Sequence, residues 1–148
     1  MRKIIVATLL ALAFASPAQA DGGLTEAVAS AWFPRTVDAD LHAMAHERVP
    51  EISACGSCMN HDGMRPGTAE VLGYNGGFSN PIAQVIDDWA SSAVHDGILS
   101  DRSYGRIGCA ERVAGNEHWF VCVLASGGSG SGGTAVTTFA MPDTAMPH

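Results

Sequence analysis

Two cysteines lie on opposite strands of a predicted β-hairpin, and their pairing constrains the fold more than any other feature of the chain. Residues 106–110 and 118–124 are strand-forming runs on either side of Gly115-Asn116, a two-residue turn of the kind that hairpins favour. With the turn centred there, Cys109 and Cys122 oppose one another in a non-hydrogen-bonded pair, whose Cα atoms lie about 4.5 Å apart. This spacing suits a disulfide. Register alone therefore predicts a Cys109–Cys122 bridge, which a slip of one residue would prevent.

The first twenty residues have the pattern of a secretory signal peptide. A basic start precedes an apolar run over residues 4–15, and Ala18-Gln19-Ala20 has the small-x-small pattern of a signal-peptidase site. We therefore expect an exported protein, periplasmic or secreted, whose mature chain begins at Asp21. The apolar run is too short for a membrane span, and no later segment approaches the roughly 20 apolar residues that spanning needs.

The charge balance argues against a polyanionic partner. The chain has 8 lysine and arginine residues against 15 aspartate and glutamate residues, a formal charge of −7. Loss of Arg2 and Lys3 with the signal leaves 6 against 15, a charge of −9, and no lysine. Such a surface repels a phosphate backbone and an anionic membrane. We predict no nucleic-acid partner and no stable membrane span, and we expect a monomer.

Periodicity predicts a mixture of helices and strands, the α+β class. We expect a signal over residues 1–20, one folded domain over residues 21–125 and a flexible, Gly/Ser-rich tail over residues 126–148. Within the domain we expect a helix over residues 24–33 and a second helix with Asp38 as its N-cap, which Pro50 either kinks or ends early. A loop over residues 54–67, a strand over residues 68–73 and a helix beginning at Pro81 should follow.

Three residues in the middle of the chain form one candidate site. His61 lies in the predicted loop, Glu70 in the strand that follows it, and His95 near the end of the helix that begins at Pro81. Two neutral imidazoles and a carboxylate suit a divalent metal such as zinc, with His61 and His95 as ligands and water in an open position. A carboxylate near a metal-bound water could act as general base, which makes Glu70 the catalytic candidate.

These residues stand in a series of motifs along the chain: Cys58-Met59-Asn60-His61, Thr68-Ala69-Glu70-Val71, Trp89-Ala90-Ser91-Ser92-Ala93-Val94-His95, Tyr104-Gly105-Arg106-Ile107-Gly108-Cys109-Ala110 and Trp119-Phe120-Val121-Cys122. This series resembles the CAP superfamily (cysteine-rich secretory proteins, antigen 5 and pathogenesis-related 1), in its small bacterial type. The resemblance implies a CAP-type α-β-α sandwich, with a small antiparallel sheet between helices and a cleft lined by His61, Glu70 and His95.

Two departures from the family pattern affect the expected chemistry. Where the family has a Glu-Asn pair this chain has Glu70-Val71, and Ser91-Ser92 stands where animal and plant members place a further glutamate. Half of the acidic part of the family site is therefore missing. This loss favours a binding cleft over an active site.

The sequence thus predicts an exported CAP-domain protein whose His/Glu-lined cleft binds a small ligand, a divalent metal or an extracytoplasmic protein. The resemblance includes lipid-binding members, so a lipid is among the expected ligands. The first alternative is a metal-assisted hydrolase that uses His61, Glu70 and His95. Enzymatic activity is left open, and a non-enzymatic role is favoured.

Cys55-Gly56-Ser57-Cys58 is a second candidate site. Its thiols could form a small disulfide within the loop, bind zinc together with His61, or act as a redox pair. The motif does not lie at a strand-to-helix junction, where a helix N-terminus would activate the first thiol. A Cys55–Cys58 disulfide is therefore expected, and a thiol-redox protein is the second alternative.

His42 and His46 lie four residues apart on the predicted second helix, beside Glu47. A zinc-protease helix needs the order His-Glu-x-x-His, and this segment reads His-Ala-Met-Ala-His. We reject that interpretation and expect an exposed histidine pair.

Overall fold

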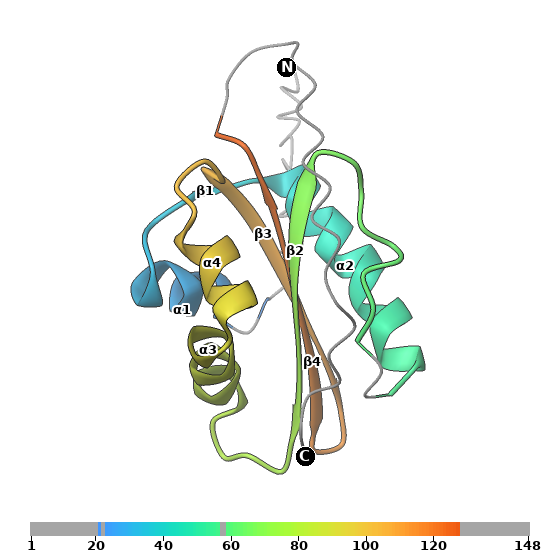
Figure 1. Ribbon diagram of the computed structural model, residues 1–148. Coiled ribbons are helices and arrows are strands. Elements are labelled where there is room, and N and C mark those ends of the chain that lie inside the picture. Colours follow the sequence, from blue (N-terminus) through green and yellow to red (C-terminus); the bar gives the residue numbers. More distant parts are fainter. Residues whose placement is uncertain (1–20, 22, 57–58, 128–148) are drawn as a thin grey trace, which may run out of the picture.

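A computed structural model describes residues 21, 23–56 and 59–127, in which a sheet lies between two layers of helices (Figure 1). Helix α2 (Ala39–Ala54) covers one face of the sheet. Helices α1 (Leu24–Ala31), α3 (Pro81–Ser91) and α4 (Ala93–Ser100) cover the other face. The predicted α+β class and α-β-α layering are confirmed.

Some predictions fall outside the described residues: the signal peptide over residues 1–20, Cys58, and the tail beyond residue 127. Within the described part of the chain, no helix combines the length and the apolar character needed to cross a membrane.

The sheet has four strands in the order β1 (Thr36–Val37), β3 (Arg106–Ala114), β4 (Glu117–Ala125) and β2 (Thr68–Gly76). Strands β2, β4 and β3 are antiparallel, as predicted, and β1 pairs with β3 in parallel. The sheet is therefore mixed. The sequence predicts only the Asp38 N-cap of the next helix in this region, because two residues are too few to show the alternation of a strand.

The predicted hairpin register is confirmed. Strands β3 and β4 meet at Gly115-Asn116, where Gly115 has the positive φ of 66° that such a turn favours. Cys109 lies directly opposite Cys122, and the two form a disulfide with their Cα atoms 4.1 Å apart. The strands extend further than predicted, because pairing continues through the polar residues near the turn.

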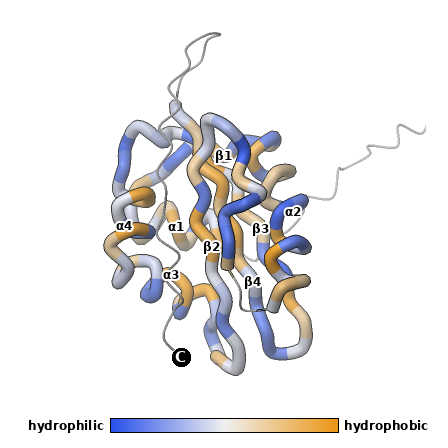
Figure 2. Tube along the Cα trace, turned by 45° about the vertical axis from the view of Figure 1, so that its right-hand side comes forward, coloured by the Kyte–Doolittle hydropathy of each residue, from blue (hydrophilic) through white to orange (hydrophobic). Residues whose placement is uncertain are grey.

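Strand β4 lies inside the sheet and is buried on both faces. Phe120, Cys122 and Leu124 pack toward α1, α3 and α4, whereas Trp119 and Val121 pack toward α2. Apolar character follows much of the central strands (Figure 2). A strand that is apolar on both sides requires a helical layer on each side, which explains the sandwich.

Helix α2 begins as predicted and continues past Pro50, where the sequence predicts either a kink or an early end. The Asp38 side chain accepts hydrogen bonds from the Asp40 and Leu41 backbone amides, the geometry of an N-cap. Pro50 does not end the helix, which continues to Ala54. Burial of Ile52 in the core beneath α2 stabilises this last turn, which follows the proline.

Helix α3 also begins as predicted, but it ends before His95. Asn80 caps it by accepting from the Ala83 amide, and Trp89 Nε1 donates to the Leu72 carbonyl at 2.7 Å. Ser92 then adopts an extended conformation, with φ −96° and ψ 114°, and α4 starts at Ala93. His95 therefore belongs to a separate helix and not to the end of the Trp89 helix.

We expect Gly108→Ala to destabilise the protein by about 1–3 kcal/mol or more, because α2 crosses β3 at this residue. A methyl group at Gly108 would lie 2.0 Å from His42 N and 2.3 Å from Leu41 C, so the helix backbone must move. Gly97→Ala is the control, since Gly97 is exposed on α4 with open space around it. It should stabilise the protein by up to about 1 kcal/mol through helix propensity. Urea unfolding measures both, and equal midpoints would contradict the close approach.

Candidate functional site

Glu70 occupies a buried position on strand β2. Its side chain is only 2% exposed and faces α2, whereas the neighbouring Ala69 and Val71 pack into the core on the opposite face. A buried carboxylate is costly unless it is paired and hydrogen-bonded. The partners of Glu70 therefore determine what this site can do.

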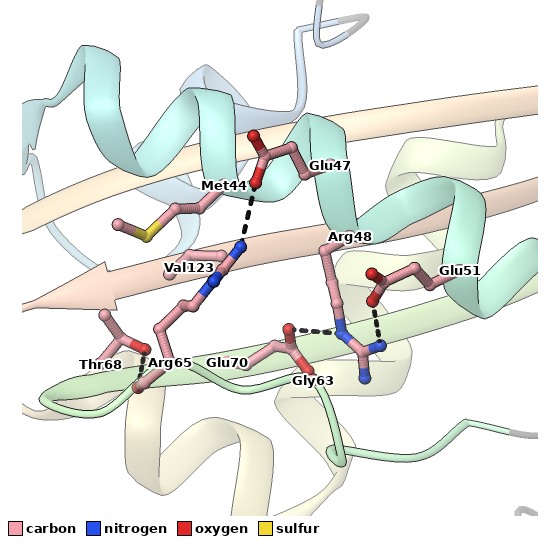
Figure 3. Close-up of a pocket in the computed structure, with 9 residues that line it drawn as sticks. All are labelled: Met44, Glu47, Arg48, Glu51, Gly63, Arg65, Thr68, Glu70 and Val123. Atoms are coloured by element: carbon pink, nitrogen blue, oxygen red, sulfur yellow. Dashed lines mark hydrogen bonds and ion pairs between the residues drawn. The ribbon is translucent and has the colours of Figure 1, made fainter.

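Arg48 of α2 is the first partner. Its Nε donates to Glu70 Oε2 at 3.1 Å, while its Nη1 donates to Glu51 Oε2 at 2.8 Å (Figure 3). Burial lowers the pKa of Arg48, but hydrogen bonding to Glu51 and the charge of Glu70 outweigh it and leave the pKa raised. Arg48 thus stays charged and compensates the carboxylate.

Arg48 was not among the site residues expected from the sequence, although a signal was present. Position 48 falls within the helical stripe that buries Leu41, Ala45, Val49 and Ile52. A charged residue inside an apolar stripe indicates a buried partner of opposite charge. The stripe does not say which acid that partner is, since Glu70 lies on another element.

His61 is the second partner of Glu70, as the predicted site requires. Its Nδ1 lies 3.1 Å from Glu70 Oε1, and its side chain is 25% exposed. Because a carboxylate only accepts, Nδ1 carries the proton, and in a neutral ring Nε2 is then an acceptor. Glu70 therefore orients His61 and leaves Nε2 to interact with another group.

His95 approaches from the other helical layer. It is half-buried on α4, and its ring centroid lies 6.5 Å from that of Trp89. Burial lowers the pKa of His95, and the nearby charge of His61 lowers it further. His95 Nδ1 is buried and has no hydrogen-bond partner among the described residues.

The predicted residues do not form a three-ligand metal centre. No group of three or more histidine, cysteine, aspartate or glutamate residues within the described ranges is placed to hold a metal ion. One oxygen of Glu70 contacts Arg48 and the other contacts His61. Glu70 thus lies behind His61 in an orienting position, with both of its oxygens engaged.

A small polar hollow lies between α2 and β2, next to the Arg48–Glu70 pair (Figure 3). Its cavity volume of about 20 Å³ has room for about one water molecule. Arg65 and Glu47 form an exposed ion pair at 3.1 Å above it. We call this feature the α2–β2 hollow; its lining residues are Met44, Glu47, Arg48, Glu51, Gly63, Arg65, Thr68, Glu70 and Val123.

The second candidate site begins at the C-terminus of α2. Cys55 is the C-cap residue and is disulfide-bonded, while its predicted partner Cys58 lies outside the described residues. The Gly56 carbonyl accepts from Trp119 Nε1 at 2.8 Å, which ties this turn to β4. The partial negative charge at a helix C-terminus disfavours a thiolate, so the position does not favour redox chemistry.

Comparison with known proteins identifies the fold of this chain through solved structures. No protein-family model matches the chain, and no curated protein matches its sequence. Solved structures do match. An outer surface protein from Borrelia burgdorferi has a TM-score of 0.57 and 19% identity, covering 70% of this chain and 89% of that one.

Two further structures agree. Venom allergen-like protein 4 of Schistosoma mansoni has a TM-score of 0.54 and 13% identity, covering 74% of this chain and 89% of that one. A cysteine-rich secretory protein from Staphylococcus aureus has a TM-score of 0.54 and 19% identity, covering 72% of this chain and 38% of that one. These are CAP-family structures, so the chain has a CAP-type fold, as its motifs predicted.

We expect Arg48→Met to destabilise the protein by about 3–5 kcal/mol, because it leaves the buried Glu70 carboxylate without the arginine that compensates its charge. Arg65→Met is the matched control: its pair with Glu47 has side chains 60% and 68% exposed, and exposed pairs contribute about 0–1 kcal/mol. Chemical denaturation of both variants, with Glu70→Gln and the Arg48→Met/Glu70→Gln double variant, measures the coupling. An Arg48→Met cost no larger than that of Arg65→Met would contradict the assignment.

Acidification should destabilise the folded protein through His95. Its pKa lies below the ordinary value of about 6.5 in the folded state, so below that pH the unfolded chain binds more protons. The resulting loss of folding stability grows as the pH falls through 6.5 and levels off below the folded-state pKa of His95. Melting temperatures between about pH 7.5 and 5, in chelator, should fall less for His95→Gln than for wild type. His46→Gln is measured in parallel, since the pKa of His46 is also lowered, first by burial. Parallel curves for wild type and His95→Gln would count against this cause.

Proposed function

We propose that this CAP-fold protein is an exported binding protein, in which His61, held by Glu70, recognises a small polar ligand or a polar group of a partner. The observation that carries the proposal is the double contact of Glu70 with Arg48 and His61. A buried carboxylate held on both oxygens presents its neighbouring imidazole in one orientation.

The same contacts support binding over hydrolysis. A general base must reach the proton that it abstracts, directly or through one water. Glu70 is almost fully buried, and each of its oxygens has a side-chain partner. Glu70 therefore suits a positioning role better than the catalytic role that the hydrolase alternative gives it.

The α2–β2 hollow supports a neutral polar group as the ligand. Arg48 and Arg65 each bond a carboxylate, so neither guanidinium is left unpaired for an anionic ligand. The cavity volume is too small for an acyl chain, so the ligand would lie across the mouth of the hollow. His61 does not line the hollow, but it contacts Glu70, which does, so a hydroxyl or amide group that donates to His61 Nε2 would bind beside the hollow.

A metal at His61 and His95 is the second candidate function, and the His61–Glu70 contact favours it. A carboxylate that accepts from one imidazole nitrogen is the usual support for a histidine that binds metal through the other nitrogen. The lowered pKa of His95 favours the neutral ring that a metal needs. A divalent ion there would supply Lewis acidity to a bound water.

Export rests on residues 1–20, and the Cys109–Cys122 disulfide is consistent with an oxidising compartment. If the protein is expressed with residues 1–20 and is exported, its measured intact mass should be that of a chain that begins at Asp21.

The test of binding is an NMR titration of isotope-labelled protein with N-acetylglucosamine, which offers hydroxyls and an amide, and with sodium dodecanoate as the lipid probe. We expect N-acetylglucosamine to shift the His61 ring and the Thr68 amide in a saturable way. His61→Gln should abolish this response. His118→Gln should retain it, since His118 forms a comparable pair with Glu111 at 2.7 Å on the hairpin.

Other outcomes count against the proposal. A response that survives His61→Gln would place the ligand elsewhere. A response to dodecanoate alone would replace the polar ligand with a lipid. The second candidate, a metal site at His61 and His95, would be established if zinc shifts the NMR signals of both rings. Both shifts should then be lost in His61→Gln and in His95→Gln.

A further inference from the structure

His42 and His46 face one another on α2 and are half-buried, not the exposed pair that the sequence predicted. Residues four apart lie on the same side of a helix. Their Nε2 atoms are 3.1 Å apart, and the rings meet edge to face with centroids 4.6 Å apart. The two Nε2 atoms therefore lie next to one another on the same side of α2.

The backbone beneath this pair is held in place. The His42 amide donates to the Asp38 carbonyl at 2.9 Å, in the capped first turn of α2. Gly108 of β3 lies against the backbone of His42, where no Cβ could fit. The backbone that carries the two rings is therefore fixed by packing, which preorganises their attachment points.

The distance between the nitrogens suits a shared metal ion. Zinc binds imidazole nitrogen at about 2.0–2.1 Å, so two ligands at a tetrahedral angle have their nitrogens about 3.3 Å apart. Burial lowers the pKa of His46, and His42 lowers it further, while Asp21 opposes them. The result favours the neutral ring, and Asp21 adds a negative charge nearby.

We propose that His42 and His46 form a site for a divalent transition-metal ion, zinc or nickel, with water completing the coordination. The site is separate from the His61–Glu70 site. Helical geometry places Arg48 roughly 200° around the α2 axis from His46, so the two sites lie on different sides of the helix.

A direct hydrogen bond between the two imidazoles also accounts for the observed distance, so the experiment must separate a shared proton from a shared metal. Full-length protein is stripped with chelator and titrated by calorimetry with zinc chloride or nickel chloride alone. The titration uses a His61→Gln/His95→Gln background, which removes the imidazoles of the other site.

We expect one ion per chain to bind in this background, with a rise in melting temperature. Adding His42→Gln or His46→Gln should each weaken binding by roughly tenfold or more, since even outer-sphere partners of a metal site contribute about 10–100-fold. Adding His118→Gln should leave binding unchanged, because its ring pairs with Glu111 on β3.

Absence of zinc and nickel binding in the His61→Gln/His95→Gln background would overturn the proposal, as would binding that neither α2 variant weakens. If a variant fails to fold, the ring nitrogens of the wild-type protein decide the matter by NMR. Zinc must then shift Nε2 of both His42 and His46, and shifts confined to other histidines would overturn the site. The sugar titration of His61 uses a different probe, so either proposal can fail alone.

Discussion

The burial of strand β4 on both faces is the constraint on which the rest of the structure depends. Because its side chains are apolar on both sides, the strand is stable only with strands beside it and helices above and below. The disulfide from Cys122 to Cys109 joins it covalently to β3. This arrangement leaves β2 at the edge of the sheet. Glu70 can lie there on a mostly apolar strand, because α2 and the loop that precedes β2 supply its polar partners.

The Arg48–Glu70 pair links three parts of the molecule. Arg48 comes from α2, Glu70 from β2, and the Arg48 guanidinium also donates to the Asn60 carbonyl in the loop that carries His61. One buried cation thereby positions the carboxylate and the loop together. The same pairing that orients His61 occupies both oxygens of the carboxylate, in keeping with the proposed binding role. The missing second glutamate of the family pattern, where this chain has Ser91-Ser92, points in the same direction.

Predictions from the sequence succeeded where the decisive contacts are local. The Asp38 N-cap acts within three residues, α3 begins at Pro81 as predicted, and the hairpin register follows from a turn that lies between the two cysteines. Predictions failed where contacts between residues far apart in the sequence determine whether an element forms or where it ends. Strand β1 exists because two residues pair with Arg106 and Ile107 of β3, and no local pattern reports that. The break at Ser92 likewise follows no strong helix-ending signal, yet it moves His95 onto its own helix.

Local chemistry and periodicity settled most of the element types and the Cys109–Cys122 bridge, because each depends on side chains near one another in the chain. The packing of layers decided the rest. Arg48 meets Glu70 across 22 residues, and no spacing rule encodes a charge pair between a helix and a strand. The facing rings of His42 and His46 show both levels: the sequence places them on one side of a helix, and only the packed helix brings their nitrogens to 3.1 Å.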